Sequence, residues 1–374
     1  MIEFFYPENS YTKDLGNSLA RFADLTIACK KKIPVPSGSI KWKPLLYEGY
    51  HSRLAAPFLY GKSLLQLGID IWKNRYDVVH IQYMRAPAIE IKLFRLLRNR
   101  YGILVDTIHT LIPHEASDKD KELHRSIYRS CDLMIVHNQI CREQLIHEFG
   151  VPEHKICVMP HGLYPVDSNK CSEYVERPDE KIHFLMFGQL RKYKGVDILL
   201  KAVSLIPLEE RSRISVTIAG PQYTKLDDTD YEAMAEELGI EDYVNFVRRH
   251  IPPEEHAELF ADTDICVLPY KELYGSGALI MAYAYEKPVI VSDDPIFMEE
   301  TENGSTGLLF AKNDPKALAD AILEATEWKA GDHKLRKDHI RSMNKTKFSW
   351  DRSAEISCKA YEAAIKYKEN HKTK

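Results

Sequence analysis

The sequence predicts an α/β protein with parallel sheets. Two short, wholly apolar segments, 265–268 and 289–291, are typical of strands that are buried on both faces. Between them lie a glycine-containing loop at 270–277 and a segment of helical composition at 278–285. This order of strand, loop, helix and strand is a parallel crossover, and similar alternation along the chain predicts doubly wound sheets.

The first half of the chain alternates strands and helices from residue 2 onward. Strands are predicted at 2–6, 25–28, 78–81, 103–105, 133–136 and 155–159. Helices are predicted at 57–75, 87–99, 120–129 and 139–149. The segment 7–16 is predicted to be a long polar loop. No GxGxxG sequence follows the first strand, which counts against a nicotinamide or flavin site.

The second half begins after a polar segment, 163–181, which has two prolines and no hydrophobic period and therefore predicts an interdomain linker. Strands are predicted at 182–187, 215–219, 243–247, 265–268, 289–291 and 307–310. Helices are predicted at 196–205, 278–285, 315–328, 331–346 and 350–370. The predicted division is a first domain at 1–165, a linker at 166–181, a second domain at 182–347 and a final helical segment at 348–374.

Size and composition narrow the class of protein. The 374 residues are enough for two domains, and the net charge of −4 does not favour binding to nucleic acid. The first residues lack the basic and apolar regions of a signal peptide, and no apolar run approaches the roughly 20 residues that span a bilayer. The seven cysteines form no CxxC pair and are typical of reduced core thiols. These features predict a cytoplasmic protein.

The loop 270–277 is a candidate anion site. Gly275 and Gly277 allow a ligand to approach the backbone closely, and the free amides of residues 276–279 point outward from the predicted helix start. Glu272 places a carboxylate a few residues away. A carboxylate beside a phosphate site indicates a ligand with hydroxyls next to its phosphates, such as a sugar nucleotide. The alternative is a surface loop with an ordinary helix cap.

Basic side chains gather at two further strand ends. Arg191, Lys192 and Lys194 crowd the turn that follows the strand 182–187, where charge-assisted contacts to phosphate are favoured. Arg248 and His250 follow the strand 243–247, where a base or a phosphate could lie. In both places the alternative is a solvated basic turn.

His109 lies just past the carboxyl end of the strand 103–105, where a ligand would be met. A structural, hydrogen-bonded histidine is the alternative interpretation. Two DxD sequences, at 228–230 and 262–264, match the metal-binding pattern of another class of transferase, but they fit helix caps or strand entries better. No metal site is therefore predicted.

The segment 29–53 mixes lysines and an arginine with Trp42, Tyr47 and Tyr50. Basic and aromatic side chains together can dock on an anionic membrane surface. A solvated loop that contributes a few aromatic side chains to the core is an equally good interpretation.

Several motifs together resemble those of the retaining family-4, or group 1, glycosyltransferases. They are PHG at 160–162, FGQLRKYKG at 187–195, AGP at 219–221 and PYKELYGSGALIMAYAYEKPVIVSD at 269–293. DTIHTLIPHE at 106–115 is similar to the histidine loop of the same family's N-terminal domain. The residues QLR at 189–191 and Ser276-Gly277 resemble those of a branch of the family found in bacterial surface-polysaccharide gene clusters. The resemblance implies the GT-B fold, in which two Rossmann-like domains face a central cleft and the last helix crosses back to the first domain.

The resemblance assigns roles by position. Lys194 matches the lysine that binds the donor diphosphate, and Arg191 is expected to take the second phosphate contact because Gln189 replaces the usual arginine. Glu272 matches the first glutamate of an E-x7-E motif, which lies against the donor sugar. The second glutamate is Ile280 here, which cannot accept a hydrogen bond from a ribose hydroxyl. His109 matches the histidine that contacts the donor sugar near the reacting carbon.

The implied sites form three sets. The catalytic set is His109, Arg191, Lys194 and Glu272. The donor-binding set is Gly188, Arg191, Lys194, Gly220, Arg248, His250, Tyr274, Gly275, Ser276, Gly277 and Ala278. The acceptor side, in the first domain, is Tyr11, Gly16, His114 and Glu115.

The implied reaction moves a hexose-type sugar, with retention, from a nucleoside diphosphate sugar to a hydroxyl of a saccharide or lipid-linked saccharide, in polysaccharide or glycolipid biosynthesis. UDP and GDP sugars are the expected donors, and no cofactor and no nucleic-acid partner is expected. The expected place is the cytoplasm of a bacterium, with peripheral association at the inner face of the membrane. Two alternatives stay open: a GT-B epimerase of sugar nucleotides, and an inactive glycosyltransferase-like binding protein, for which Ile280 is the argument.

Overall fold

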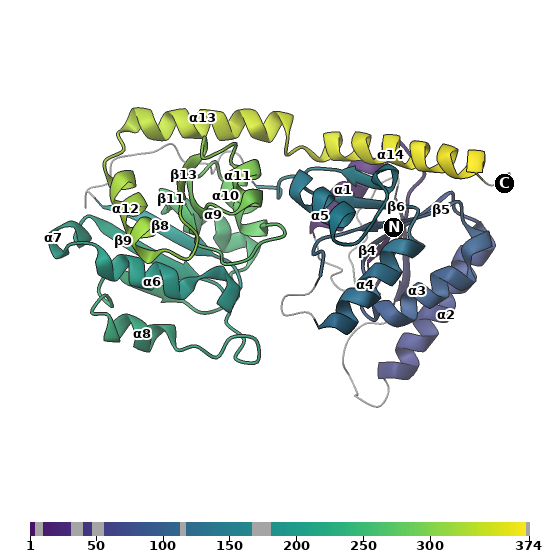
Figure 1. The fold of residues 1–374 in the computed structure, drawn as a ribbon, viewed down its shortest axis with the longest axis horizontal. Helices are drawn as coiled ribbons and strands as arrows, with labels where there is room; N and C mark the ends of the chain where they lie inside the picture. The colour runs from purple at the N-terminus through teal and green to yellow at the C-terminus, as the bar shows by residue number, and fades with distance from the viewer. Residues whose placement is uncertain (4–9, 31–39, 47–55, 113–116, 167–180, 372–374) are drawn as a thin grey trace. The chain divides into compact units, whose positions relative to one another are not determined.

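The computed structural model describes residues 1–3, 10–30, 40–46, 56–112, 117–166 and 181–371. The chain divides into two compact units. The first contains Met1–Gly162 and Phe348–Lys374, and the second contains Leu163–Lys347. Each unit has its own parallel sheet covered by helices (Figure 1). The expected pair of Rossmann-like α/β domains is confirmed.

The sheet of the first unit has seven strands in the order β3-β2-β1-β4-β5-β6-β7. The strands are β1 Ile2–Glu3, β2 Thr26–Lys30, β3 Lys41–Leu46, β4 Val78–Tyr83, β5 Ile103–Thr107, β6 Leu133–Val136 and β7 Ile156–Val158. The helices are α1 Ser10–Leu19, α2 Ala56–Asn74, α3 Pro87–Leu96, α4 Asp118–Ser130, α5 Gln139–His147 and α14 Trp350–His371, with short 3-10 turns η1 Arg98–Arg100 and η2 Glu153–Lys155. All pairings among the described strands are parallel.

The sheet of the second unit has six parallel strands in the order β10-β9-β8-β11-β12-β13. The strands are β8 Ile182–Phe187, β9 Ile214–Ala219, β10 Val244–Val247, β11 Ile265–Leu268, β12 Val289–Ser292 and β13 Gly307–Phe310. The helices are α6 Val196–Leu205, α7 Leu208–Arg211, α8 Tyr231–Glu237, α9 Pro253–Ala261, α10 Gly277–Ala284, α11 Pro295–Glu300, α12 Pro315–Thr326 and α13 Ala330–Thr346, with a 3-10 turn η4 at Lys192–Lys194.

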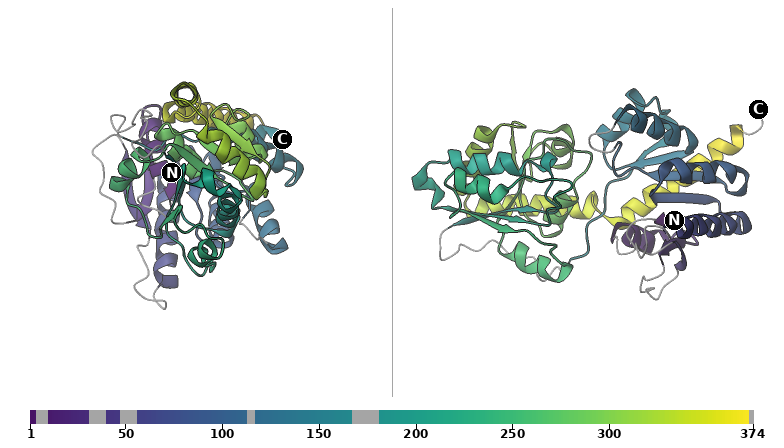
Figure 2. Two further views of the ribbon diagram at one scale, coloured as in Figure 1. Left: turned by 90° about the vertical axis from the view of Figure 1, so that its left-hand side faces the viewer. Right: turned by 90° about the horizontal axis from the view of Figure 1, so that it is seen from below.

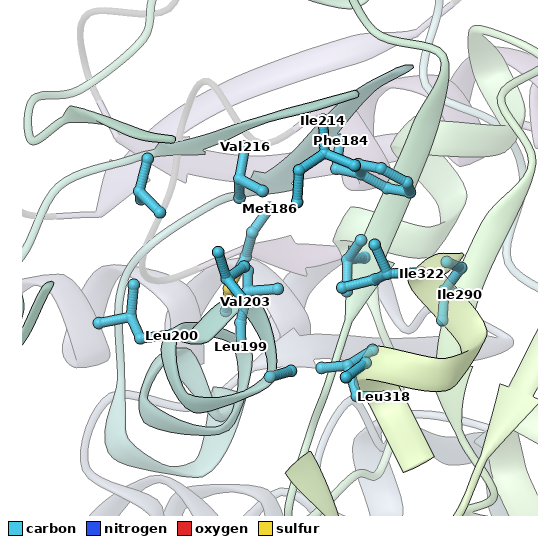
Figure 3. Close-up of a cluster of buried hydrophobic side chains, with 14 of the residues drawn as sticks. Phe184, Met186, Leu199, Leu200, Val203, Ile214, Val216, Ile290, Leu318 and Ile322 are labelled. Atoms are coloured by element: carbon cyan, nitrogen blue, oxygen red, sulfur yellow. The ribbon is translucent and has the colours of Figure 1, made fainter. Parts of the chain in front are cut away.

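The core of the second unit explains why its elements are the easiest to read from the sequence. β11 and β12 are buried at every position, as expected for strands covered on both faces. Figure 3 shows Phe184 and Met186 of β8 packed together with Leu199 of α6 and Leu318 of α12. Burying one such side chain stabilises the fold by about 1.5–3 kcal/mol. Because several of these side chains lie on one face of each helix, they hold that face against the sheet.

The last helix belongs to the first unit, as the resemblance implies. In Figure 1 and Figure 2, α14 lies alongside α1, and Ser18 Oγ of α1 donates a hydrogen bond to the Asp351 carboxylate at 2.9 Å. Ser353 Oγ donates to the Pro160 carbonyl at 2.7 Å. Ala354 and Ala364 are buried in the same core as β5 and β6.

Two sequence predictions in the first unit are wrong. Residues 10–16 are not loop but the start of α1, because Tyr11, Leu15 and Leu19 recur every four residues and are all buried. Part of the segment 29–53 is a strand, β3, which pairs with β2 at the edge of the sheet. No helix in the described part of the chain combines the length and the apolar character that a membrane crossing requires.

Candidate active site

The loops that leave β8 and β11 carry the candidate donor site of the second unit. The chain leaves β8 toward β9 and β10 on one side and returns to β11 on the other, so the strand order reverses between β8 and β11. In open α/β sheets, ligands bind beyond the carboxyl ends of the strands at such a reversal. Gly188 follows β8, and residues 269–277 follow β11.

Three glycines allow the backbones of these loops to pack closely against each other. Gly220 has φ +152°, and a Cβ atom there would lie 2.1 Å from the Gly188 carbonyl oxygen. Gly195 has φ +75°, and its Cβ would lie 2.0 Å from the Pro269 carbonyl oxygen. Gly188 itself has φ +109°. Only glycine fits these positions, so the backbone after β8, β9 and β11 forms one close-packed surface.

Arg191 and Lys194 provide the positive charge of this surface. Lys192, which lies between them, forms an ion pair with Asp228 at 2.9 Å. Among the described residues, neither Arg191 nor Lys194 forms an ion pair or a hydrogen bond through its side chain. Lys192 is therefore neutralised within the protein, whereas Arg191 and Lys194 can each bind an anion.

Lys194 extends over the turn that follows β8. A Cβ on Gly188 would lie 3.0 Å from Lys194 Nζ, and Nζ lies 5.4 Å from the centre of the Tyr270 ring. Burial lowers the pKa of Lys194, the nearby Arg191 lowers it further, and Tyr193 opposes the shift. A half-buried ammonium group without a carboxylate is a high-energy arrangement that a bound phosphate would relieve.

The start of α10 adds backbone donors to the site. Ser276 is the N-cap, and its hydroxyl accepts a hydrogen bond from Leu279 N at 3.1 Å. The first amides of the helix, at Gly277 and Ala278, have no partner within the helix and present positive ends of the helix dipole. A Cβ on Gly275 would meet no atom within 4 Å, whereas one on Gly277 would lie 2.9 Å from Tyr164 Oη. The space in front of Gly275 is therefore open to a ligand.

The remaining predicted donor residues differ in position. Glu272 is exposed and Tyr274 is half-buried in the loop before α10, and each has an interaction within the protein. Arg248 forms an ion pair with Glu232 at 2.9 Å and, with the exposed His250, follows β10, which is the outermost strand. The structure groups Arg191, Lys194 and the start of α10 at the β8 and β11 ends, and leaves Arg248 and His250 two strands away from β8.

Ile280 is buried within α10, with 2% of its side chain exposed. Its aliphatic side chain contributes to the core beneath the site and offers no acceptor for a hydroxyl group. Any ligand hydroxyls near this helix must be held by other groups.

The first unit has a histidine cluster at the carboxyl ends of its strands. His109, His137 and His161 follow β5, β6 and β7, and the ring centres of His109 and His137, and of His137 and His161, lie 5.4 Å apart. The His109 ring stacks on Tyr83, with ring centres 4.2 Å apart and an interplanar angle of 6°. Tyr11 of α1 meets all three imidazoles edge-on.

Burial holds these imidazoles neutral. It lowers the pKa of His137 to about 4 and that of His161 to about 3, and it lowers the pKa of His109 well below its usual range. His137 Nδ1 donates to the Met159 carbonyl at 2.8 Å, so its Nε2 carries the lone pair. Among the described residues, the buried Nε2 atoms of His109 and His137 have no hydrogen-bond partner.

Sequence reasoning found His109 but missed Tyr83, His137 and His161 as parts of the same cluster. The signal was present, because His137 directly follows the apolar strand β6 and His161 follows β7 by three residues. Carboxyl ends of parallel strands meet at one edge of a sheet, so polar residues at such positions come together.

The other first-unit predictions have separate outcomes. Tyr11 lies at the centre of the cluster, while Gly16 is a packing position, where a Cβ would lie 2.9 Å from Ile27 Cδ1. His114 and Glu115 lie outside the described residues.

The two DxD sequences have structural roles. Asp230 is the N-cap of α8 and accepts a hydrogen bond from Ala233 N at 3.2 Å. Asp264 accepts from His183 N at 2.8 Å, at the entry to β11. In the described ranges, no three His, Cys, Asp or Glu side chains are arranged to hold a metal ion.

The histidine cluster predicts a specific acid sensitivity. The folded pKa of His137, about 4, lies below its ordinary value of 6.5, so the unfolded chain takes up the proton first as the pH falls. This contribution to stability is complete above pH 6.5 and is lost between pH 6.5 and 4, at roughly 1 kcal/mol per pH unit. Urea unfolding of His137→Gln over this range should show a correspondingly shallower pH dependence than the wild type.

The matched control is His147→Gln, which removes an exposed imidazole from α5. Asp106, whose pKa burial raises to about 8, contributes in the opposite sense but is present in all three proteins and cancels from the comparison. Equal pH slopes for the wild type and His137→Gln would contradict the assignment of a buried neutral imidazole.

Comparison with solved structures identifies the class of fold. The sucrose-phosphate synthase of Thermosynechococcus elongatus matches with a TM-score of 0.73 and 20% identity, covering 96% of this chain and 94% of that one. Anabaena Alr3699/HepE, solved in complex with UDP and glucose, matches with a TM-score of 0.73 and 15% identity, covering 97% and 98%. These likenesses, together with the two parallel α/β units and the returning α14, define a GT-B fold.

Sequence comparison finds glycosyltransferases as the similar proteins. Residues 168–343 match the model described as glycosyl transferases group 1, and residues 8–165 match the model described as glycosyltransferase family 4. The D-inositol 3-phosphate glycosyltransferase of Corynebacterium glutamicum is 28% identical over 318 residues, covering 78% of this chain and 73% of that protein. The two halves of the chain are thus similar to glycosyltransferases of group 1 and of family 4.

Proposed function

We propose that this protein transfers a hexose-type sugar from a nucleoside diphosphate sugar to a hydroxyl of a saccharide or lipid-linked saccharide, with retention of configuration. The observation that carries the proposal is the pair Arg191 and Lys194. Both lie at the β8 and β11 ends without an ion-pair partner in the described part of the chain, beside the start of α10. This is the charge distribution that a diphosphate leaving group requires.

The chemistry follows from that charge distribution. As the bond between the sugar and the diphosphate breaks, negative charge grows on the diphosphate oxygens. Lys194, Arg191 and the amides at Gly277 and Ala278 would stabilise that charge and so lower the barrier, without a proton transfer to the leaving group. Glu272 would lie against the donor sugar.

The donor is proposed to be a UDP or GDP sugar. The Anabaena neighbour was solved with UDP and glucose, and the arrangement of Lys194 and the α10 amides can neutralise either diphosphate. With Ile280 at the position of the second glutamate, ribose recognition falls to other groups, so we expect more of the donor affinity to come from the diphosphate. No cofactor and no metal takes part in this proposal.

The acceptor is proposed to bind the first unit, near the histidine cluster. The proposed role is in polysaccharide or glycolipid synthesis. The D-inositol 3-phosphate glycosyltransferases among the relatives are named for a phosphorylated polyol instead, which also offers hydroxyl groups. We further propose that the enzyme is bacterial and cytoplasmic and that it binds a lipid-linked acceptor at the inner face of the membrane.

Proton NMR of the reaction tests this function directly. UDP- and GDP-hexoses are incubated with and without saccharide acceptors, and the anomeric protons are followed. Transfer with the anomeric configuration of the donor supports the proposal, and an inverted product would overturn retention. Epimerised sugar without an acceptor would select the epimerase, and donor binding without turnover would select the inactive binding protein.

His109→Ala should lower turnover more than donor affinity. The ring of His109 is fixed by Tyr83 on one face, so it can contact a reacting group without reorganisation, whereas the diphosphate contacts lie in the other unit. We expect a loss in kcat of roughly 100-fold or more with a change in donor Kd of less than about 3-fold. His147→Ala is the control, and unchanged kcat in His109→Ala would return His109 to a structural role.

A further inference from the structure

An apolar patch is exposed on two neighbouring helices of the first unit. Six of the fourteen large apolar side chains that are exposed in the described part of the chain lie on α2 and α3, and 45% to 83% of each is accessible. They are Phe58, Leu65, Ile69 and Trp72 of α2 and Ile89 and Leu96 of α3. Single exposed apolar residues are common on protein surfaces, but a cluster of this kind marks an interaction site. We call these six residues the α2–α3 patch.

The patch is a single surface because α2 and α3 pack against each other. A Cβ on Gly68 of α2 would lie 3.3 Å from Leu93 Cδ1 of α3. The Arg100 guanidinium, just after α3, lies 4.5 Å from the centre of the Trp72 ring. The two helices run side by side in Figure 1.

The sequence of α2 gives this helix two apolar faces. Leu64, Leu67 and Ile71 are buried against the unit. Phe58, Leu65, Ile69 and Trp72 follow the helical spacing of seven, four and three residues and form the outer face. A helix that only covered the core would carry polar residues at those outer positions.

Basic side chains accompany the patch on the same two helices. The exposed basic side chains on and beside the two helices are Lys62, Lys73, Arg75, Lys92 and Arg95, and Arg100 lies over Trp72. Arg95 donates hydrogen bonds to neutral oxygens of Ser126 and Ser130, so these contacts do not offset its positive charge.

The acidic groups of the same segment do not cancel this charge. Asp70 is paired with Lys43 at 2.5 Å. Glu90 is buried and accepts hydrogen bonds from Tyr60 Oη and from Arg85 N. Asp77 is the one exposed acidic residue between Ala56 and Arg100 in the described chain that has no such partner. The two helices therefore expose apolar and basic side chains together, with little acidic charge from the same segment to offset them.

We propose that the α2–α3 patch docks on an anionic lipid surface. Apolar side chains enter the boundary between head groups and acyl chains, and the surrounding lysines and arginines meet the lipid phosphates. A soluble apolar partner would not need the basic side chains that α2 and α3 expose beside the apolar ones. The inference deepens the proposed function, since it would bring the enzyme to a lipid-linked acceptor.

Residues 31–39 and 47–55 of the segment 29–53 lie outside the described residues, and Lys41 in its described part is exposed. In the described part of that segment, Lys43 is held by Asp70 and by Tyr76 Oη at 3.0 Å, inside the first unit. Its charge is therefore used within the protein. The basic side chains of α2 and α3 face solvent instead.

Vesicle flotation tests the proposal with the full chain and without any sugar nucleotide. Vesicles of phosphatidylcholine with phosphatidylglycerol should bind the wild type, and vesicles of phosphatidylcholine alone should bind it much less. Lys62→Gln with Lys92→Gln should weaken binding by roughly 30-fold, and Phe58→Ser with Leu65→Ser by at least about 10-fold. The matched controls are Lys201→Gln with Lys334→Gln and Leu208→Ser with Leu335→Ser, which change equally exposed residues of the second unit.

A second readout reports on the depth of docking. Bromine-labelled lipids in the same vesicles should quench Trp72 fluorescence, and Trp72→Phe should remove that quenching. No binding to anionic vesicles, or equal binding by the patch and control variants, would overturn the proposal. Concentration-dependent dimers in sedimentation that the Phe58→Ser, Leu65→Ser variant abolishes, without vesicle binding, would assign the patch to a second copy of the chain. Because donor binding is measured separately, failure here is distinct from failure of the transferase proposal.

Discussion

Lys194→Ala should weaken binding of a nucleoside diphosphate by roughly 10- to 100-fold, equivalent to about 1.5–3 kcal/mol, because a charge-assisted contact to phosphate is lost. The loss in kcat should be larger, on the order of 100- to 1,000-fold, since the contact strengthens as charge grows on the leaving group. Calorimetric titration of UDP and GDP measures the first effect, and initial-rate kinetics measures the second.

The turn that carries Lys194 supplies its own control. Lys192→Ala removes a lysine two residues away that is already paired with Asp228. That pair is exposed and contributes little to stability, and the charge that Lys192→Ala removes is already offset by Asp228, so donor affinity should stay within roughly 2-fold. If the two variants lose affinity equally, the effect is general electrostatics and Lys194 is not a direct ligand.

Gly195→Ala should destabilise the second unit by roughly 3 kcal/mol or more. The left-handed backbone at Gly195 disfavours any side chain, and a Cβ there would lie 2.0 Å from the Pro269 carbonyl oxygen, which belongs to the loop after β11. Because both loops belong to the proposed donor site, the variant should also lose affinity for nucleoside diphosphates. Denaturant unfolding and calorimetry measure the two effects.

Gly239→Ala is the control that separates backbone strain from steric clash as causes of the lost stability in Gly195→Ala. Gly239 has a similar backbone, with φ +63°, but a Cβ there would meet no atom within 4 Å. It should therefore show only the backbone strain, roughly 1–2 kcal/mol, and normal donor affinity. Equal destabilisation by the two substitutions would mean that the close approach of Gly195 to Pro269 does not constrain the site.

The sequence predicted the six strands of the second unit because their apolar signals are strong, but it missed the short helices α7, α8, α9 and α11. β11 is apolar at all four positions, and its bounds match the prediction, as do those of β8, β13 and α6. α1 was missed because its three core residues, Tyr11, Leu15 and Leu19, are separated by polar residues and a glycine that resemble a loop. β3 was missed because it is an edge strand with alternating lysines.

The site was only partly readable for a different reason. Arg191, Lys192 and Lys194 look equivalent in the sequence, and the partner that neutralises Lys192 is 36 residues further along the chain. The sequence cannot indicate which basic residue is paired, because that depends on how the loops after β8 and β9 meet. The histidine cluster, in contrast, follows from sheet topology once the three strands are known to be parallel neighbours.

The central claim is that the second unit binds a nucleoside diphosphate sugar through Arg191 and Lys194. A thermal-shift panel of UDP, GDP, ADP, CMP and dTDP and their common sugar conjugates, with and without EDTA, tests it most directly, since a ligand that binds only the folded state raises the unfolding midpoint. We predict that UDP or GDP and its sugar conjugate raise the midpoint of the wild type and of Lys192→Ala, with or without EDTA, but not that of Lys194→Ala. No shift with any nucleotide, or an undiminished shift in Lys194→Ala, would contradict the claim.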